Sequence, residues 1–227
     1  MLAGMHRVAI VLACAFVTLR AGDTARSVRI ASATAERVPL VVVLHGDRED
    51  ASDSERRWRE PVESRGWELL TLTCPEKLGC KGGSWYRWDG DPSWLRDQVR
   101  DVVRDRPIDT SRIFLVGWSG GATYIGKHLQ AWPRMFAATV IHGGGVPPVD
   151  DVCLDRPFPA YFLVGDRNPA HGGAQRLRAY FETCDQDVRW DLVPGANHAR
   201  EDAALTAEKA DEILEWLAQH PRTLESS

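Results

Sequence analysis

Short apolar runs, rich in β-branched residues and bounded by Gly or Pro, recur along the chain. Runs of this kind are typical of strands that are covered on both faces of a sheet. The clearest ones occupy residues 39–44 and 113–116, and further strands are predicted over 67–73, 137–141, 159–164 and 188–193. A weaker run at 27–31 predicts a further strand at the edge of the sheet.

Between these runs, apolar residues return at the spacing of a helix face. In the last helix predicted, the apolar positions i, i+3, i+4 and i+7 are Ala210, Ile213, Leu214 and Leu217. Other predicted helices cover about 54–65, 95–103, 122–129 and 177–181. Strands that alternate with helices predict an α/β fold with a doubly wound, mostly parallel sheet. In such sheets the functional site lies beyond the carboxyl ends of the strands.

Composition narrows the class of protein. The chain has 227 residues, of which 44% are hydrophobic and 26% charged, as in a globular domain with a sizeable core. The net charge is −4 and no basic run stands out. Nucleic acid and anionic membrane surfaces are therefore not expected partners.

The N-terminus resembles an export signal. His6 and Arg7 precede the apolar run Val8–Leu19, whose 12 residues are too few to span a bilayer but suit a signal peptide. We expect a signal peptide over residues 1–21, a single domain over 22–227, no transmembrane segment, and a secreted or periplasmic protein. A buried N-terminal strand is the alternative.

Cysteine usage agrees with export. Removal of the signal takes Cys14 away and leaves four cysteines, an even number that suits two disulfides in an oxidising compartment. We expect Cys74 to pair with Cys80 across a short loop, which leaves Cys153 for Cys184. A zinc site is the competing interpretation, but no C-x-x-C spacing supports it.

The segment Gly117-Trp118-Ser119-Gly120-Gly121 follows a buried strand and precedes a helix. In a G-x-S-x-G turn of this kind, the glycines permit close packing and the serine hydroxyl points out above the sheet. The start of the helix supplies free N–H groups that suit an oxyanion. Ser119 is therefore the candidate nucleophile, although the pattern alone also occurs in loops of no consequence.

A serine nucleophile needs a base and a group that orients the base. His198, in the loop after the last strand, is the candidate base. Asp166 follows the strand 159–164 and is the candidate acid, which gives the chain order Ser, Asp, His. Many such enzymes place the acid three residues after the strand-ending glycine, where this chain has Asn168. Because an amide cannot offset the charge of the ring, we favour Asp166, with Asn168 as an assisting or substitute group.

Two further features complete the candidate site. The backbone N–H groups of Gly120 and Asp47 would form the oxyanion hole, the latter after the strand end at His45-Gly46. The aromatic residues Trp85, Trp88 and Trp118 could line a substrate pocket. For the loop at 84–91, the alternative is that its rings cover the edge of the core.

With these motifs in place, the chain resembles the α/β-hydrolase superfamily, from about Val38 to the C-terminal helix. More narrowly, it is similar to compact secreted feruloyl esterases, acetyl xylan esterases and polyhydroxybutyrate depolymerases. The resemblance implies an α/β-hydrolase fold without a large lid, and activity without a metal or an organic cofactor.

The leading hypothesis is a serine carboxylesterase that hydrolyses short-chain or aromatic acyl esters, free or attached to a polymer, through an acyl-enzyme. One alternative is a serine peptidase on the same fold. Another is a secreted binding protein that keeps the fold but has lost activity. This alternative is suggested by Asn168 at the usual position of the acid.

Overall fold

The computed structural model describes residues 25–28 and 36–223. The predicted signal peptide and residues 29–31 of the predicted edge strand lie outside these ranges. Among the described residues, no helix is both long and apolar enough to cross a bilayer.

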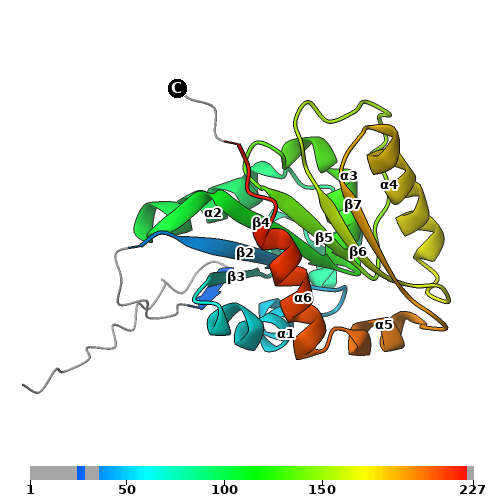
Figure 1. Ribbon diagram of the computed structural model, residues 1–227, viewed down its shortest axis with the longest axis horizontal. Helices are drawn as coiled ribbons and strands as arrows, with labels where there is room; N and C mark the ends of the chain where they lie inside the picture. The colour runs from blue at the N-terminus through cyan, green and yellow to red at the C-terminus, as the bar shows by residue number, and fades with distance from the viewer. Residues whose placement is uncertain (1–24, 29–35, 224–227) are drawn as a thin grey trace, which may run out of the picture.

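The core is a seven-stranded sheet in the order β1-β3-β2-β4-β5-β6-β7, and the predicted fold class is confirmed (Figure 1). Six strands are parallel, and β1 at the edge pairs antiparallel with β3. Their bounds are Ala25–Val28 (β1), Val38–Leu44 (β2), Glu68–Leu72 (β3), Ile108–Trp118 (β4), Ala138–His142 (β5), Ala160–Gly165 (β6) and Val188–Val193 (β7).

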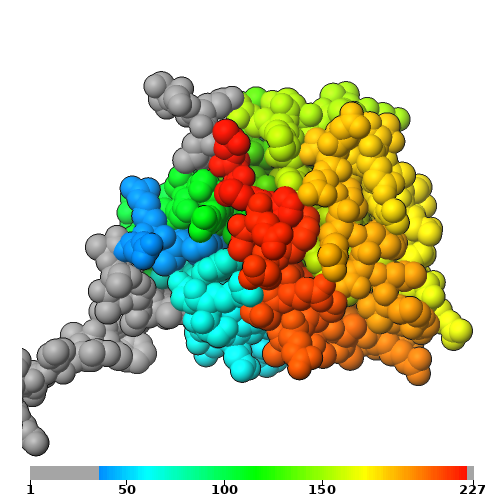
Figure 2. Space-filling view, viewed as in Figure 1, coloured from blue at the N-terminus to red at the C-terminus, as the bar shows by residue number. Residues whose placement is uncertain are grey.

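Helices cover both faces of the sheet. The face that includes Val41, Val43 and Phe114 packs against α1 (Ala51–Ser64) and α6 (Ala207–Ala218). The opposite face packs against α2 (Ser93–Asp105), α3 (Gly120–Lys127) and α4 (His171–Thr183). In the space-filling view, the C-terminal segment in red lies directly against α1 in cyan (Figure 2).

The short elements lie in the loops. Three 3₁₀ turns, η1 (Glu76–Leu78), η2 (Lys81–Gly83) and η3 (Trp85–Arg87), shape the long segment between β3 and α2. A fourth, η4 (Leu129–Ala131), follows α3. Helix α5 (His198–Ala204) begins after β7, where the sequence had predicted only a loop. Its start is fixed by the Asn197 side chain, which accepts a hydrogen bond from the N–H of Arg200.

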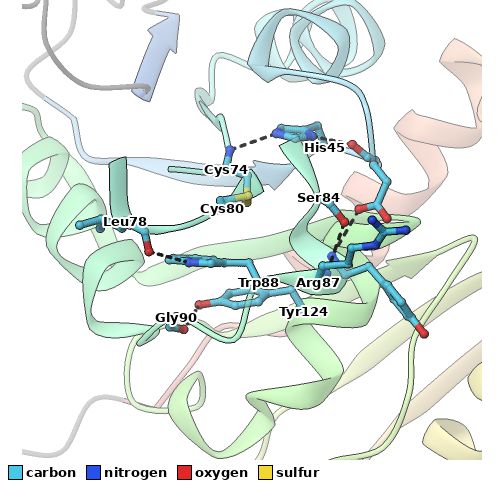
Figure 3. Close-up of a disulfide and its surroundings, with 12 residues drawn as sticks. His45, Cys74, Leu78, Cys80, Ser84, Arg87, Trp88, Gly90 and Tyr124 are labelled. Carbon is cyan, nitrogen blue, oxygen red and sulfur yellow. Dashed lines mark hydrogen bonds between the residues drawn. A yellow bond between two sulfur atoms is a disulfide. The ribbon is translucent and has the colours of Figure 1, made fainter. Parts of the chain in front are cut away.

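Two disulfides join the described cysteines, in the pairing that the sequence predicted. Cys74 and Cys80 have Cα atoms 5.8 Å apart and close the loop after β3 (Figure 3). Cys153 and Cys184 have Cα atoms 5.3 Å apart and connect the loop after β5 to the end of α4. The first bridge thus closes a loop within the segment between β3 and α2, and the second anchors a long loop to a helix end.

Candidate active site

Ser119 occupies a tight turn between β4 and α3. Its φ of 51° and ψ of −107° are rare for a residue with a side chain, which marks local strain. A Cβ on Gly117 would lie 2.5 Å from the Ala122 nitrogen, and one on Gly121 would lie 2.5 Å from the Leu44 oxygen. Glycine at both positions therefore lets strand and helix approach closely enough to hold Ser119 in this conformation.

A cavity of about 300 Å³ opens beside Ser119 at the carboxyl edge of the sheet. Its lining includes Ser119, Gly120, His198, Asn168 and Asp47, so the structure brings most of the predicted site residues together. The remaining lining residues are Tyr86, Thr123, Gly143, Gly144, Pro169 and Ala170.

The oxyanion-hole candidates are neighbours in space. Gly120 is the first residue of α3, so its N–H is one of the donors that a helix leaves free at its start. The Asp47 side chain lies directly over Gly120 and accepts a hydrogen bond from the N–H of Tyr86 at 3.3 Å. The lining of the cavity therefore includes a carboxylate close to the N–H of Gly120, where an oxyanion is expected.

His45 supports the loop that holds Asp47. The ring is fully buried; its Nδ1 donates to the Gly46 oxygen at 2.6 Å, and its Nε2 accepts from the N–H of Cys74 at 3.0 Å (Figure 3). Both ring nitrogens are occupied, which fixes a neutral tautomer. Burial also lowers the pKa of His45. His45 is thus a structural residue that links the loop at Gly46 and Asp47 to the loop after β3.

His198 is the first residue of α5 and is half-buried. Its ring stacks on the indole of Trp118, with centroids 4.5 Å apart and planes 11° from parallel. Burial lowers the pKa of His198, while the nearby carboxylates of Asp202, Glu49 and Asp47 raise it. The neutral ring that a general base needs is therefore favoured.

The structure places Asn168, and not Asp166, against the His198 ring. The Asn168 Nδ2 lies 3.0 Å from His198 Nδ1. Asp166 is exposed, and its Oδ1 accepts a hydrogen bond from the N–H of Gly195 at 2.7 Å, so it stabilises the turn after β7. The spacing after the strand-ending glycine thus decides which side chain reaches the histidine.

Glu201 is a part of the site that the sequence did not suggest. The residue is fully buried, and its Oε2 accepts a hydrogen bond from Asn168 Nδ2. Burial raises the pKa of its carboxyl to about 7, against the opposing effect of the Asn168 hydrogen bond. Glu201 and His198 are three residues apart, on one face of α5, which is the signal that could have found it.

The tryptophans predicted to line a pocket have other roles. Trp85 and Trp88 are 0% and 4% exposed and pack around Tyr124, to which their ring centroids lie 5.1 and 5.2 Å away. The Trp88 indole donates to the Leu78 oxygen at 3.2 Å (Figure 3). These rings cover the core edge, which was the alternative interpretation. The aromatic side chain at the cavity is Tyr86, which is 54% exposed.

A network of charges surrounds Trp118. Arg57, on α1, donates to both carboxylate oxygens of Glu49 at 2.7 and 3.0 Å and to Asp202 at 2.9 Å. The Glu49 carboxylate also accepts from the N–H of Gly46 at 2.9 Å. The guanidinium carbon of Arg57 lies 5.6 Å from the centroid of the Trp118 ring. One arginine therefore connects the loop that carries Glu49, the Trp118 ring beside Ser119 and the helix that carries His198.

The sequence matches no protein-family model, and the search of curated proteins finds no match. Solved structures do match. The Bacillus cereus carboxylesterase has a TM-score of 0.68 at 16% identity, over 88% of this chain and 95% of that one. A thermostable esterase has a TM-score of 0.67 at 18% identity over 87% of this chain, which spans only 59% of the esterase.

A third match is Est1E from Butyrivibrio proteoclasticus, solved with ferulic acid. The TM-score is 0.61 at 12% identity, over 86% of this chain and 95% of that one. These similarities show that the chain has the α/β-hydrolase fold, as its motifs indicated.

Proposed function

We propose that the protein is a serine hydrolase of carboxylic esters, with Ser119 as nucleophile and His198 as general base. The observation that carries this proposal is the shared cavity, in which a strained serine at a helix start and a half-buried histidine face the same space. The solved structures with the same fold include proteins described as esterases and a carboxylesterase, which supports an ester substrate.

The reaction would proceed through an acyl-enzyme. His198 takes the Ser119 proton as the hydroxyl oxygen bonds to the ester carbonyl carbon. The N–H groups of Gly120 and Asp47 hold the resulting oxyanion. His198 then gives the proton to the departing alcohol, and a water molecule, activated by the same ring, releases the acid and regenerates Ser119.

We assign the third position of the triad to Asn168. Its contact with His198 Nδ1 supports this assignment, whereas the Asp166 carboxylate is held in the turn at Gly195. An amide can orient the ring but does not offset the charge of the imidazolium. In the chymotrypsin-type triad, replacement of the acid by Asn lowers kcat about 10⁴-fold. We therefore expect modest turnover from this enzyme.

The cavity suits a small acyl group. Its volume of about 300 Å³ is at the low end for ligand sites, and Gly143, Gly144 and Ala170 line it. The Asp47 carboxylate in the lining of the cavity would disfavour anionic substrates by like-charge repulsion. Neutral short-chain esters, free or attached to a polymer, fit these constraints best.

We also propose that the protein is exported. The two disulfides are compatible with an oxidising compartment, because disulfides rarely persist in the cytosol. Fractionation of cells that express the full chain, with N-terminal sequencing of the product, tests the expected cleavage near residue 21. A full-length product retained in the cytosol would overturn this part.

The alternative is a secreted binding protein that has lost activity. The uncharged Asn168 at the acid position is the observation that favours it. Peptide hydrolysis on the same fold is a second alternative, which a comparison of ester and peptide substrates would separate.

Fluorophosphonate labelling of the purified protein, with hydrolysis of p-nitrophenyl acetate and butyrate, tests the proposal. Wild type and the matched control Ser64→Ala, at the exposed end of α1, should label and turn over. Ser119→Ala should do neither. If wild type labels no faster than Ser119→Ala and hydrolyses no ester tested, the binding-protein alternative replaces the esterase.

A further inference from the structure

Glu201 is a buried carboxyl group that the proposed reaction leaves unused. It belongs to α5 together with His198, has no exposed surface, and contacts Asn168 through Oε2. Buried carboxyl groups are costly and rare unless they are paired. Its place directly behind the residue that orients His198 suggests a role in that orientation.

The surroundings of the Asn168 amide fix which of its ends faces His198. The Oδ1 accepts a hydrogen bond from the N–H of Ala170 at 2.9 Å. The Nδ2 donates to the Gly143 oxygen at 3.2 Å and to Glu201. The three contacts agree on one orientation, so the amide nitrogen is the atom that lies 3.0 Å from His198 Nδ1.

The orientation of the Asn168 amide determines which nitrogen of His198 carries the proton. The two hydrogens of the Asn168 amide nitrogen are directed to Gly143 and Glu201, and this nitrogen cannot accept a hydrogen bond. A proton on His198 Nδ1 would therefore point at a group that cannot accept it, so Nδ1 carries no proton in this orientation. The proton of the neutral ring must then be on Nε2. A ring in that tautomer cannot take the proton of Ser119, because the lone pair needed for the transfer is on the wrong nitrogen.

We propose that Glu201 is a positioning residue whose carboxyl group, acting through the Asn168 amide, decides which nitrogen of His198 carries the proton. The inference rests on the proposed function, which gives the tautomer its importance. With Glu201 ionised, its carboxylate holds the amide nitrogen toward itself and the ring stays in the Nε2–H form.

With Glu201 protonated, the amide turns by about 180°, as Asn side chains can. The carboxyl O–H then donates to Asn168 Oδ1, and this oxygen also accepts the Nδ1–H of His198. Glu201 gains one proton from solvent, and the ring exchanges its own proton from Nε2 to Nδ1 through solvent. The Nε2 lone pair is then available to Ser119. The turned amide gives up its contacts with Ala170 and Gly143, so the proton on Glu201 is required to hold it.

The groups around Glu201 allow this switch near neutral pH. His142, on β5, has Nε2 3.0 Å from the Glu201 backbone oxygen, and burial lowers the pKa of His142 to about 4. His198 and Asp202 share the helix with Glu201, and Asp202 is paired with Arg57 of α1. Burial raises the pKa of Glu201 to about 7, so this carboxyl changes charge where His142 stays neutral and Arg57 stays charged.

Nitrogen-15 NMR of the imidazole rings reads the tautomer directly and does not depend on catalysis. The intact protein would be measured between about pH 5 and pH 9, as wild type, Glu201→Gln and the matched control Glu208→Gln at an exposed position of α6. The expected result is a change of His198 from the Nδ1–H to the Nε2–H form as pH rises, in wild type and Glu208→Gln. Glu201→Gln should show no such change.

Fluorophosphonate labelling over the same range gives the second readout. In wild type, the rate should fall about tenfold for each pH unit above the titration of Glu201, because one required proton is lost. In Glu201→Gln this fall should be absent. Melting temperatures of the three proteins identify any variant that is not folded.

The outcomes separate this inference from the proposed function. A pH-linked tautomer change that persists in folded Glu201→Gln, or is absent in wild type, overturns the role of Glu201 even if labelling is normal. If Glu201→Gln does not fold, the wild-type protein decides the question. The tautomer change of His198 must then occur at the same pH as the titration of the Glu201 carboxyl resonance, and a different pH overturns the role of Glu201. If the tautomer change of His198 depends on Glu201 but the protein does not react with fluorophosphonate, the role of Glu201 is supported and the proposed esterase function is overturned.

Discussion

The indole of Trp118 lies nearly parallel to the imidazole of His198, at a centroid separation of 4.5 Å. The Trp118 indole packs tightly against the backbone at Gly46 and Gly143. A Cβ would lie 2.6 Å from the indole at Gly46 and would overlap it at Gly143. The face of an aromatic ring attracts a cation. Since Asn168 carries no charge, the Trp118 face is a neighbour that can favour the imidazolium formed when His198 takes a proton.

We therefore expect Trp118→Leu to lower kcat more than it raises KM. Cation–π contacts contribute about 0.5–2 kcal/mol, which corresponds to a loss of about 2- to 30-fold. Trp118→Phe, which keeps an aromatic face, should recover part of the loss. Steady-state kinetics on p-nitrophenyl acetate would check this, and equal effects of Leu and Phe would argue against a role for the ring face.

Exchange of the two candidate acids separates their roles. Asn168→Asp places a carboxylate at His198 Nδ1 and should raise kcat about tenfold or more, because the imidazolium gains a counter-charge. Asp166→Asn should leave activity within about twofold, since an amide oxygen can still accept from the Gly195 N–H. The opposite pattern in ester hydrolysis would return the acid to Asp166.

Replacement of Arg57, which does not line the cavity, should lower both the stability of the protein and the reactivity of Ser119. Arg57→Lys keeps the charge but loses the paired contact with Glu49 and the contact with Asp202. We expect a destabilisation of about 1–3 kcal/mol and slower fluorophosphonate labelling. The control is Arg56→Ala, an exposed residue whose partner Asp53 is on the same helix; neither residue lines the cavity. Equal effects of the two variants would contradict the connecting role of Arg57.

Stability should depend on pH through Glu201. Its pKa is about 7 in the folded protein and near 4.5 when exposed, so the folded state binds this proton more tightly. The resulting stabilisation is present at low pH and is lost as pH rises from about 4.5 to 7, by about 3 kcal/mol. Glu201→Gln should therefore be more stable than wild type at about pH 8 but not at about pH 4.

Urea unfolding at the two pH values measures this difference. The comparison with wild type at each pH cancels the opposite contribution of His142, whose lowered pKa costs stability as pH falls below about 6.5. A constant difference between the two proteins across this range would show that Glu201 does not titrate with a raised pKa.

The Cys153–Cys184 bridge should stabilise the fold without affecting the chemistry. It ties the loop after β5 to α4 across a sequence separation of 31 residues. Its replacement by two serines should cost about 3 kcal/mol of unfolding free energy. Labelling of Ser119 at low temperature should remain near the wild-type rate. A melting temperature that does not change on reduction or replacement would contradict this expectation.

Periodicity predicts the sheet well, because burial on both faces leaves a continuous apolar run that no other structure explains better. The strand predicted over 159–164 is observed at Ala160–Gly165 and is buried throughout, and Ser119 and His198 do line one cavity. The sequence order of strands also places both residues at the same edge, since parallel strands end together.

The sequence did not predict which side chains contact one another across loops. Asp166 and Asn168 are two residues apart, and charge alone favoured the aspartate, but the turn at Gly195 captures its carboxylate. Glu201 was missed because α5 is too short to be predicted from periodicity, so the three-residue spacing from His198 to Glu201 was not seen as one helix face. From the sequence, Trp85 fits a pocket and a core position equally well. Its packing against Tyr124 in the structure shows that it is a core residue.

The contacts of Arg57 join positions 49 and 202, which are synthesised at nearly opposite ends of the chain. The loop that carries Glu49 is translated early, yet Arg57, which binds this loop, meets its second carboxylate, Asp202, only when α5 has been made. A nascent chain that stops before residue 198 would lack both the base and this counter-charge. If Ser119 and His198 act as proposed, activity would therefore appear only after α5 has been made.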